Sequence, residues 1–218
     1  MTYRFQAEIK AELLRAMAHL AAQRDVRYYM QGVQVYATPE VILGATDGSV
    51  VGVLRTHQLA SCCFEIRVPN DILKQMAKAR GIAVLGSDDG AAWVLKVGAL
   101  SLAWKAEQER YPELHRALPA RVSGEACKFD ARLLGLFLKV ANDLGQVKDK
   151  AHAVLLGQNG QNPALVSMPD VPDFIGALAP LRNEAPHPAP AMIAPQWAKE
   201  PPAIPANWRA AAETCDLV

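Results

Sequence analysis

The sequence predicts an α+β fold made of repeated units, each with one helix followed by an antiparallel β-meander. Apolar residues recur at spacings of three and four in three separate stretches, which is typical of amphipathic helices. Short β-rich runs separated by turn residues follow each stretch. The same order of patterns returns along the chain, which indicates repetition even though the copies share little sequence identity.

The first unit is expected to begin with a helix over residues 8–25, whose apolar stripe includes Leu13, Met17 and Leu20. β-rich runs then follow one another, and Asp47-Gly48 is a strong hairpin signal between the last two. The strands of this unit are therefore expected at 26–29, 32–37, 41–46 and 50–56.

The second and third units repeat this order. A strand over 63–68 leads into a helix that Pro69 or Asn70 begins and Gly81 ends. In the third unit, Asp130 is the expected N-cap of a helix that ends at Gly145. The strands that follow these helices are expected at 82–87, 92–97 and 99–105, and at 152–157, 164–168 and 174–178.

The composition is that of an ordinary globular protein. The chain has 218 residues, of which 51% are hydrophobic and 21% are charged. No apolar run approaches the roughly 20 residues of a membrane helix, and the N-terminus lacks the apolar core of a signal peptide, so we expect a cytoplasmic protein without a membrane partner. A formal net charge of +1 gives no global attraction to nucleic acid.

The sequence carries no signature of an enzyme or of a cofactor site. It has no glycine-rich phosphate loop and no nucleophile-elbow pattern. The four cysteines lack the spacing of zinc ligands, and the adjacent Cys62 and Cys63 are expected to be ordinary strand residues. We therefore expect no catalytic residue, no metal and no cofactor.

Four stretches, in this order, resemble the bacterial DNA polymerase III beta subunit, the sliding clamp. Residues 25–33 read DVRYYMQGV, and 45–48 read ATDG, as in the hairpin of that family. Residues 66–69 read IRVP before a helix, and 110–119 read RYPELHRALP, similar to the segment that joins two clamp domains. The resemblance implies the DNA-clamp fold, with one full clamp domain and one half domain.

The resemblance also implies domain limits. Residues 1–119 are similar to the central domain of the beta clamp, and residues 120–183 are similar to the second half of its last domain. Residues 184–218 are rich in proline and are expected to form a tail.

The function implied by the resemblance is that of a processivity factor. Such a ring encircles duplex DNA without reading its sequence, so it needs only sequence-independent phosphate contacts. From charge alone the basic helix residues would be ordinary solvated side chains, but the resemblance implies that some face the DNA. These are Lys10, Arg15, Lys74, Lys78, Arg80, Arg132 and Lys139.

A clamp also tethers DNA polymerase or other proteins, each of which inserts a short peptide into an apolar pocket. Without the resemblance, most of the matching residues would be assigned to core or interdomain packing. With it, the expected lining is Met30, Thr46, Gly48, Val50, Val51, Pro112, Arg116, Ala117, Ala177, Leu178, Pro180, Leu181 and Arg182. Ser49-Val50 replaces the His-Arg that follows ATDG in the family, which should alter peptide selectivity.

Assembly follows from the number of units. Rings of this family contain twelve such units, so a chain with three is expected to form a homo-oligomer, with a tetramer favoured. A clamp loader is a possible further partner. The alternative is a clamp-derived regulatory or decoy protein that binds clamp partners without encircling DNA.

Overall fold

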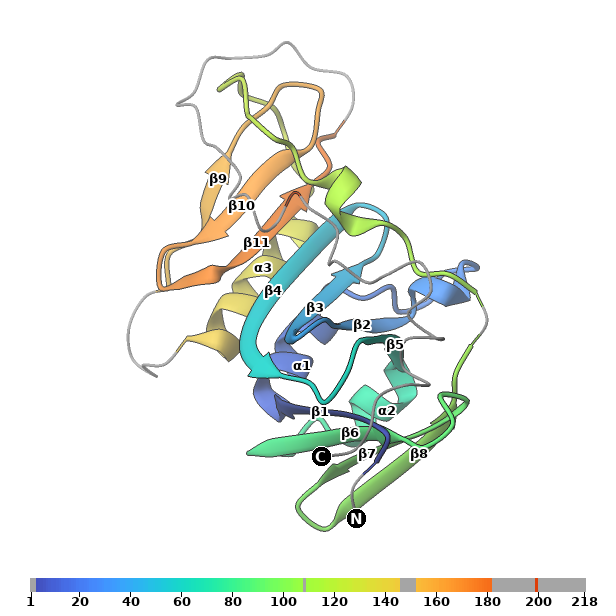
Figure 1. The fold of residues 1–218 in the computed structure, drawn as a ribbon. Coiled ribbons are helices and arrows are strands. Elements are labelled where there is room, and N and C mark those ends of the chain that lie inside the picture. Colours follow the sequence, from blue (N-terminus) through green and yellow to red (C-terminus); the bar gives the residue numbers. More distant parts are fainter. Residues whose placement is uncertain (1–2, 108, 146–151, 182–198, 200–218) are drawn as a thin grey trace.

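The computed structural model describes residues 3–107, 109–145, 152–181 and 199, and these form two antiparallel sheets with three α-helices packed against them (Figure 1). The smaller sheet has the strand order β1-β6-β7-β8, and the larger has the order β5-β2-β3-β4-β11-β10-β9. The helices are α1 (Ala11–Ala18), α2 (Asn70–Gln75) and α3 (Ala131–Leu144), and the short 3-10 helices are η1 (Tyr28–Met30) and η2 (Leu114–Ala117). The strands are β1 (Phe5–Lys10), β2 (Gly32–Ala37), β3 (Glu40–Thr46), β4 (Val50–Leu59), β5 (Phe64–Pro69), β6 (Ile82–Ser87), β7 (Ala92–Val97), β8 (Leu100–Lys105), β9 (Leu155–Gly157), β10 (Ala164–Met168) and β11 (Val171–Leu178).

The first two units exchange their first strands. Each unit runs strand, helix and three-stranded meander, as β1-α1-β2-β3-β4 and β5-α2-β6-β7-β8. Strand β1 pairs with β6 of the second unit, and β5 pairs with β2 of the first, both antiparallel. This reciprocal exchange gives the pair of units a quasi-twofold arrangement and joins their cores.

The third unit extends the larger sheet. Its helix α3 is followed by β9, β10 and β11, and β11 pairs antiparallel with β4, from Leu178 opposite Val50 to Phe174 opposite Leu54. One continuous sheet of seven strands therefore runs from the first unit into the third.

The predicted start of the first helix is wrong. Residues 5–10 form β1, and α1 begins only at Ala11 and ends at Ala18. Phe5, Ala7 and Ile9 are buried and alternate with more exposed polar residues, which is the period of a strand. The edge of β6 supplies the hydrogen-bonding partner for this strand.

The predicted strand at 26–29 is also wrong, because the chain turns into η1 there. The carboxylate of Asp25 accepts a hydrogen bond from the backbone N–H of Arg27 at 2.8 Å, which closes a local turn. Val26 is 95% exposed in this turn, so no buried face favours an extended conformation.

The other predicted elements are confirmed, with shifted ends. Helix α2 begins at Asn70, directly after Pro69, but ends at Gln75 instead of continuing to Gly81. The Asp130 carboxylate caps α3 by accepting the N–H of Arg132 at 2.8 Å, and α3 ends before Gly145. The repeated helix-and-meander fold predicted from the sequence is thus present.

One apolar core joins both sheets. Phe5, Phe64 and Trp93 meet at its centre, where the ring centroids of Phe64 and Trp93 are 5.0 Å apart. Phe137 and Phe174 extend this core to the third unit. None of the helices in the described part of the chain combines the length and apolar character needed to span a bilayer. The predicted tail at 184–218 lies outside the described residues, apart from residue 199.

Candidate functional site

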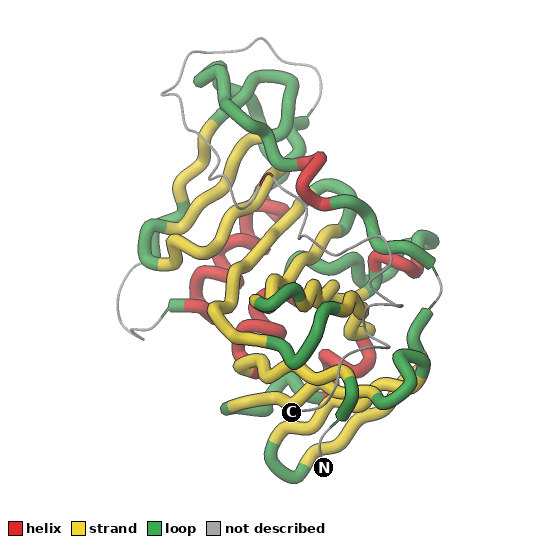
Figure 2. Tube along the Cα trace, in the orientation of Figure 1, coloured by secondary structure: helices red, strands yellow, loops and turns green. Residues whose placement is uncertain are grey.

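The three helices form a layer on one face of the sheets. Helix α1 contacts α2 on one side and α3 on the other, and α1 and α3 lie behind β4 and β11 in the view of Figures 1 and 2. The helix η2 lies on the opposite face of the same strands (Figure 1). Each of the predicted DNA-facing residues lies on a helix of this layer or within a few residues of one.

Two of the predicted DNA-facing cations are neutralised by neighbouring carboxylates. Arg15 of α1 contacts Asp143 of α3, with 3.2 Å between Nε and Oδ2, and His19 lies 3.0 Å from the same oxygen. Arg132 pairs with Asp130 at 2.6 Å, and this contact lowers the pKa of Asp130. These cations therefore attract phosphate less than their number suggests.

The remaining predicted cations are exposed, and none has an ion-pair partner among the described residues. Four of them belong to α2, to the segment that follows it, or to the residue before α1. These parts of the chain meet because Lys10 pairs with Ile82 in the sheet and the Ala11 N–H donates to the Gly81 carbonyl at 2.8 Å. These four are Lys10, Lys74, Lys78 and Arg80. We call them the basic cluster; Lys139 of α3 lies apart from it.

Glycines allow α1 and α3 to approach the junction between β4 and β11. Gly52 and Gly176 face each other across the two strands. A Cβ atom on Gly176 would lie 2.7 Å from Cε1 of Phe137 and 2.8 Å from the carbonyl oxygen of Val51. The absence of side chains at this pair lets Phe137 pack directly on the sheet.

The predicted pocket residues of β4 and β11 point to opposite faces of the sheet. Val50 and Leu178 belong to the core on the helix side. Val51 and Ala177 face the other way, into a second apolar cluster that includes Tyr111 and Leu114. Because side chains alternate along a strand, a pocket on the η2 side can use Val51 and Ala177 but not their neighbours.

Burial divides the other predicted pocket residues into a covered set and an accessible set. Met30 and Thr46 are buried, like Val51 and Ala177. Pro112 and Pro180 are half-buried. The exposed residues are Gly48, Arg116, Ala117 and Leu181, and Arg182 lies outside the described residues.

Backbone contacts place part of the accessible set side by side. The N–H of Ala179 donates to the Ser49 carbonyl at 2.8 Å, so Pro180 and Leu181 continue from β11 beside the Gly48 hairpin. Helix η2 packs against β3 and β4 and carries Ala117 and Arg116, whose guanidinium contacts Glu113 at 2.6 Å. The hairpin, the end of β11 and η2 thus contribute to one part of the surface. It consists of Gly48, Arg116, Ala117, Pro180 and Leu181, and we call it the hairpin rim.

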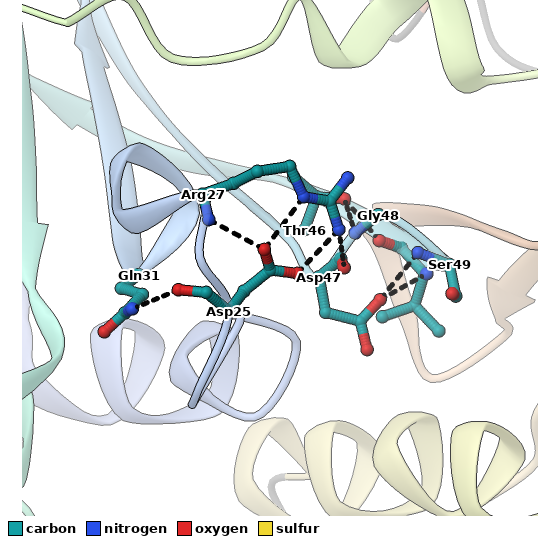
Figure 3. A network of polar contacts seen from close by, with 8 residues as sticks. Asp25, Arg27, Gln31, Thr46, Asp47, Gly48 and Ser49 are labelled. Atoms are coloured by element: carbon teal, nitrogen blue, oxygen red, sulfur yellow. Dashed lines mark hydrogen bonds and ion pairs between the residues drawn. The ribbon is translucent and has the colours of Figure 1, made fainter.

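The hairpin itself is held by its own side chains (Figure 3). Asp47 Oδ1 accepts the N–H groups of Ser49 and Val50 at 2.7 and 2.8 Å, and Thr46 Oγ1 accepts the N–H of Gly48 at 3.0 Å. Gly48 has a φ of 91°, a backbone conformation that favours glycine.

Arg27 contributes a positive charge to this hairpin, which the sequence comparison missed. Its guanidinium pairs with Asp25 and donates to the Asp47 carbonyl at 3.3 Å (Figure 3). A Cβ on Gly48 would lie only 2.7 Å from Nη2 of Arg27. Arg27 therefore places a planar guanidinium at this hairpin, although Ser49-Val50 replaces the His-Arg of the clamp family. The Asp25-x-Arg27 spacing is the sequence feature that could have indicated it.

Comparison with solved structures decides the fold. The structure matches a sliding clamp (DNA polymerase III subunit beta) from Bartonella birtlesii bound to griselimycin, with a TM-score of 0.65 and 12% identity over 84% of this chain and 67% of that chain. It matches a Pseudomonas aeruginosa sliding clamp with a TM-score of 0.63 and 14% identity over 84% and 67%. The chain has the sliding-clamp fold. It spans about two thirds of the length of these clamps.

The likeness to the clamps is one of structure. No family model matches the sequence, and no curated protein matches it. A Helicobacter pylori beta clamp bound to a DNA ligase peptide matches with a TM-score of 0.64 and 12% identity over 84% of this chain and 67% of that one. Peptide binding is thus known for a protein with the sliding-clamp fold.

Tyr111 ties the segment between the second and third units to the hairpin of the clamp fold. Its hydroxyl accepts the N–H of Thr46 at 3.1 Å and donates to the carbonyl of Gly32 at 3.2 Å. Burial raises the pKa of this hydroxyl, so it stays protonated and can make both bonds.

Tyr111→Phe is expected to lower the free energy of unfolding by about 1–3 kcal/mol, because the buried Thr46 N–H loses its partner. Urea denaturation measures this change. Tyr29→Phe leaves the hydrogen bonds of Tyr111 intact and is the matched control. Equal stability of the two variants would contradict the assigned role of the hydroxyl.

The Arg27 contact is expected to be visible in a titration. Hydrogen bonds from the Arg27 guanidinium and from the Arg27 backbone N–H lower the pKa of Asp25 from its usual 3.8 to about 2. Since the pKa is depressed in the folded state, the contact stabilises the fold above about pH 4 and is lost as the pH falls toward 2. Arg27→Gln removes the guanidinium but keeps the backbone N–H, so NMR titration should give a pKa for the Asp25 carboxyl that is raised from about 2 toward 3.8. An unchanged low value would rule out the guanidinium as a cause.

Proposed function

We propose that this chain is a sliding-clamp-type DNA polymerase processivity factor. Copies of it join edge to edge into a ring around duplex DNA, and short peptides of DNA polymerase or other proteins bind at the hairpin rim. The observation that carries the proposal is the layer of helices α2, α1 and α3 on one face of the sheets. A ring with this layer turned inward presents helices to the duplex.

The charges of the helix layer support DNA binding without sequence readout. The basic cluster offers cations that form no ion pair among the described residues, and phosphate attraction is independent of base sequence. Arg15, Arg132 and Lys139 were also predicted to face DNA. We assign the first two a smaller share because Asp143 and Asp130 pair with them.

The hairpin rim supports the tethering role. Leu181 is 48% exposed beside the hairpin, and Ala117 is exposed on η2. Arg27 and Arg116 add guanidinium donors nearby, although Asp25 and Glu113 pair with them and offset their charge. Apolar contact beside a few hydrogen-bond donors suits a short hydrophobic peptide. We therefore propose Gly48, Ala117, Pro180 and Leu181 as the residues that contact the peptide. We prefer them to Val51 and Ala177, which are buried.

The role is proposed to be non-enzymatic and cytoplasmic, with a clamp loader as an additional partner if the ring must open. Within the described residues, His, Cys, Asp and Glu side chains form no group of three suited to a metal ion.

A second candidate function is that of a clamp-derived decoy, which binds clamp partners without encircling DNA. The pairing of Arg15 and Arg132 with carboxylates favours it, because it weakens the attraction of the helix layer for phosphate. The hairpin rim would serve both functions equally.

Retention on DNA separates the two functions. The chain is incubated with a nicked circular duplex, and with the same duplex made linear, in the presence of a loader if one is needed. After gel filtration, a clamp stays with the circle and is lost from the linear form. A decoy is lost from both, and equal retention on both forms would show ordinary binding instead of encirclement.

A further inference from the structure

The edge strands of this fold differ in how well they are protected. The outer side of β1 is covered, because the Ser61 N–H donates to the Gln6 carbonyl at 2.8 Å and the Lys10 N–H donates to the Gln58 side chain at 3.1 Å. Strand β9 has only three residues. At β5, the Trp104 indole donates to the Arg67 carbonyl at 3.1 Å.

Strand β8 has none of these protections. It has six residues, pairs with β7 without a register shift, and contains neither proline nor glycine. No strand of the described part of the chain pairs with its outer side. A regular, uncovered edge of this length is a template for pairing with another chain, because its backbone N–H and C=O groups lack protein partners.

The chain itself shows what such a strand pairs with. Strand β4 is the last strand of the first unit, and β11 is the last strand of the third. They pair antiparallel over five residue pairs, with their helices α1 and α3 side by side on the same face. Strand β8 is the last strand of the second unit, and among the described residues it is the one last strand whose outer side has no strand partner.

We propose that β8 is the assembly surface of this protein and that its partner is β8 of a second copy, paired antiparallel. The pairing of β4 with β11 inside one chain would then have a counterpart between chains, where β8 of one copy pairs with β8 of another. Pairing of a strand with itself in this way is twofold symmetric and closes after two copies.

The direction in which the side chains point limits the possible registers. Leu102 is 8% exposed and turned to the core, whereas Ser101 and Ala103 are exposed on the other face. Directly opposite residues in an antiparallel pair share a face. This allows pairing centred on Leu102 or on Ala103, and we propose the register centred on Leu102, which sets Leu100 opposite Trp104 and Ser101 opposite Ala103. It also leaves Lys105 outside the paired stretch.

The consequence concerns how the ring closes, and here the inference rests on the proposed function. Two chains joined at β8 make an arc of six units, half of a twelve-unit ring. Two arcs must then meet through their third units, where β9 is the outermost strand. The ring would alternate two kinds of contact instead of repeating one head-to-tail contact.

A charge exchange tests the pairing, and it is done without DNA so that its outcome does not depend on the proposed function. In Ser101→Asp/Ala103→Asp, each aspartate meets an aspartate of the other copy, and the mass measured by light scattering should fall to half that of the unchanged chain. In Ser101→Asp/Ala103→Lys, each aspartate meets a lysine, and the mass should return. Both side chains are exposed on one chain, so circular dichroism should show that all forms are folded.

Three results would overturn the inference. They are a monomeric unchanged chain, a double-aspartate variant of full mass, or no recovery in the aspartate-lysine variant. If the unchanged chain is monomeric and removal of residues 184–218 makes it dimeric, the tail occupies β8 instead. Full retention on circular DNA combined with any of these results would refute pairing at β8 and leave the clamp function standing.

Discussion

Phe137→Ala is expected to lower the free energy of unfolding by about 3–5 kcal/mol, the usual cost of removing a fully buried phenylalanine. Phe137 of α3 is 0% exposed and makes an edge-to-face contact with Phe174 of β11, with ring centroids 6.2 Å apart. It also fills the space over Gly176. Its loss leaves a cavity at the junction between the first and third units.

The neighbouring residue provides the control. Leu138 is 54% exposed, so Leu138→Ala removes a side chain of similar apolar character from the surface of the same helix. We expect its effect to stay within about 0.5 kcal/mol. Urea denaturation of both variants measures the difference. Similar losses for the two would mean that α3 does not pack on β11 as described.

Neutralising three of the four cations of the basic cluster is expected to have the largest effect on DNA binding. In Lys74→Gln/Lys78→Gln/Arg80→Gln, the slope of log affinity against log salt concentration should fall in magnitude by about three, since each phosphate contact contributes about 0.9. Binding to a nicked circular duplex over a salt series gives this slope. Because the contacts are sequence-independent, changing the DNA sequence should not alter the loss.

Lys96→Gln is the control for this experiment. Lys96 lies over the ring of Tyr3, with Nζ 5.2 Å from the ring centroid. It points away from the core, since its neighbours Leu95 and Val97 are buried. Its replacement should leave the salt slope unchanged. A slope that falls equally with Lys96→Gln, or does not fall with the triple variant, would contradict an inward-facing helix layer.

Elements with local signals could be predicted from the sequence, whereas elements that depend on distant partners could not. Asp130 and Gly145 mark the ends of α3 within the helix's own sequence, and the structure confirms them. Residues 8–10 of strand β1 were predicted to belong to the first helix, although Phe5, Ala7 and Ile9 already showed the alternation of a strand. Its pairing partner β6 begins at residue 82, far along the chain.

In the candidate site, too, the local features could be predicted from the sequence and the contacts with distant residues could not. The hairpin at Asp47-Gly48 could be predicted because its hydrogen bonds are local. The alternation of side chains already implied that Val50 and Val51 face opposite sides of the sheet. That Tyr111 and Leu114 cover Val51 depends on tertiary packing, as does the position of Arg27 over Gly48. The assignment of the pocket and of the DNA-facing residues stays a prediction.

Electron cryo-microscopy of the assembled particle tests the central claim most directly, because it shows both the closure of the ring and the direction in which the helices face. We expect a closed ring whose opening accommodates duplex DNA and is lined by α1, α2 and α3, with the basic cluster at its inner surface. Particles without a central opening, or rings with this helix layer on the outside, would contradict the account.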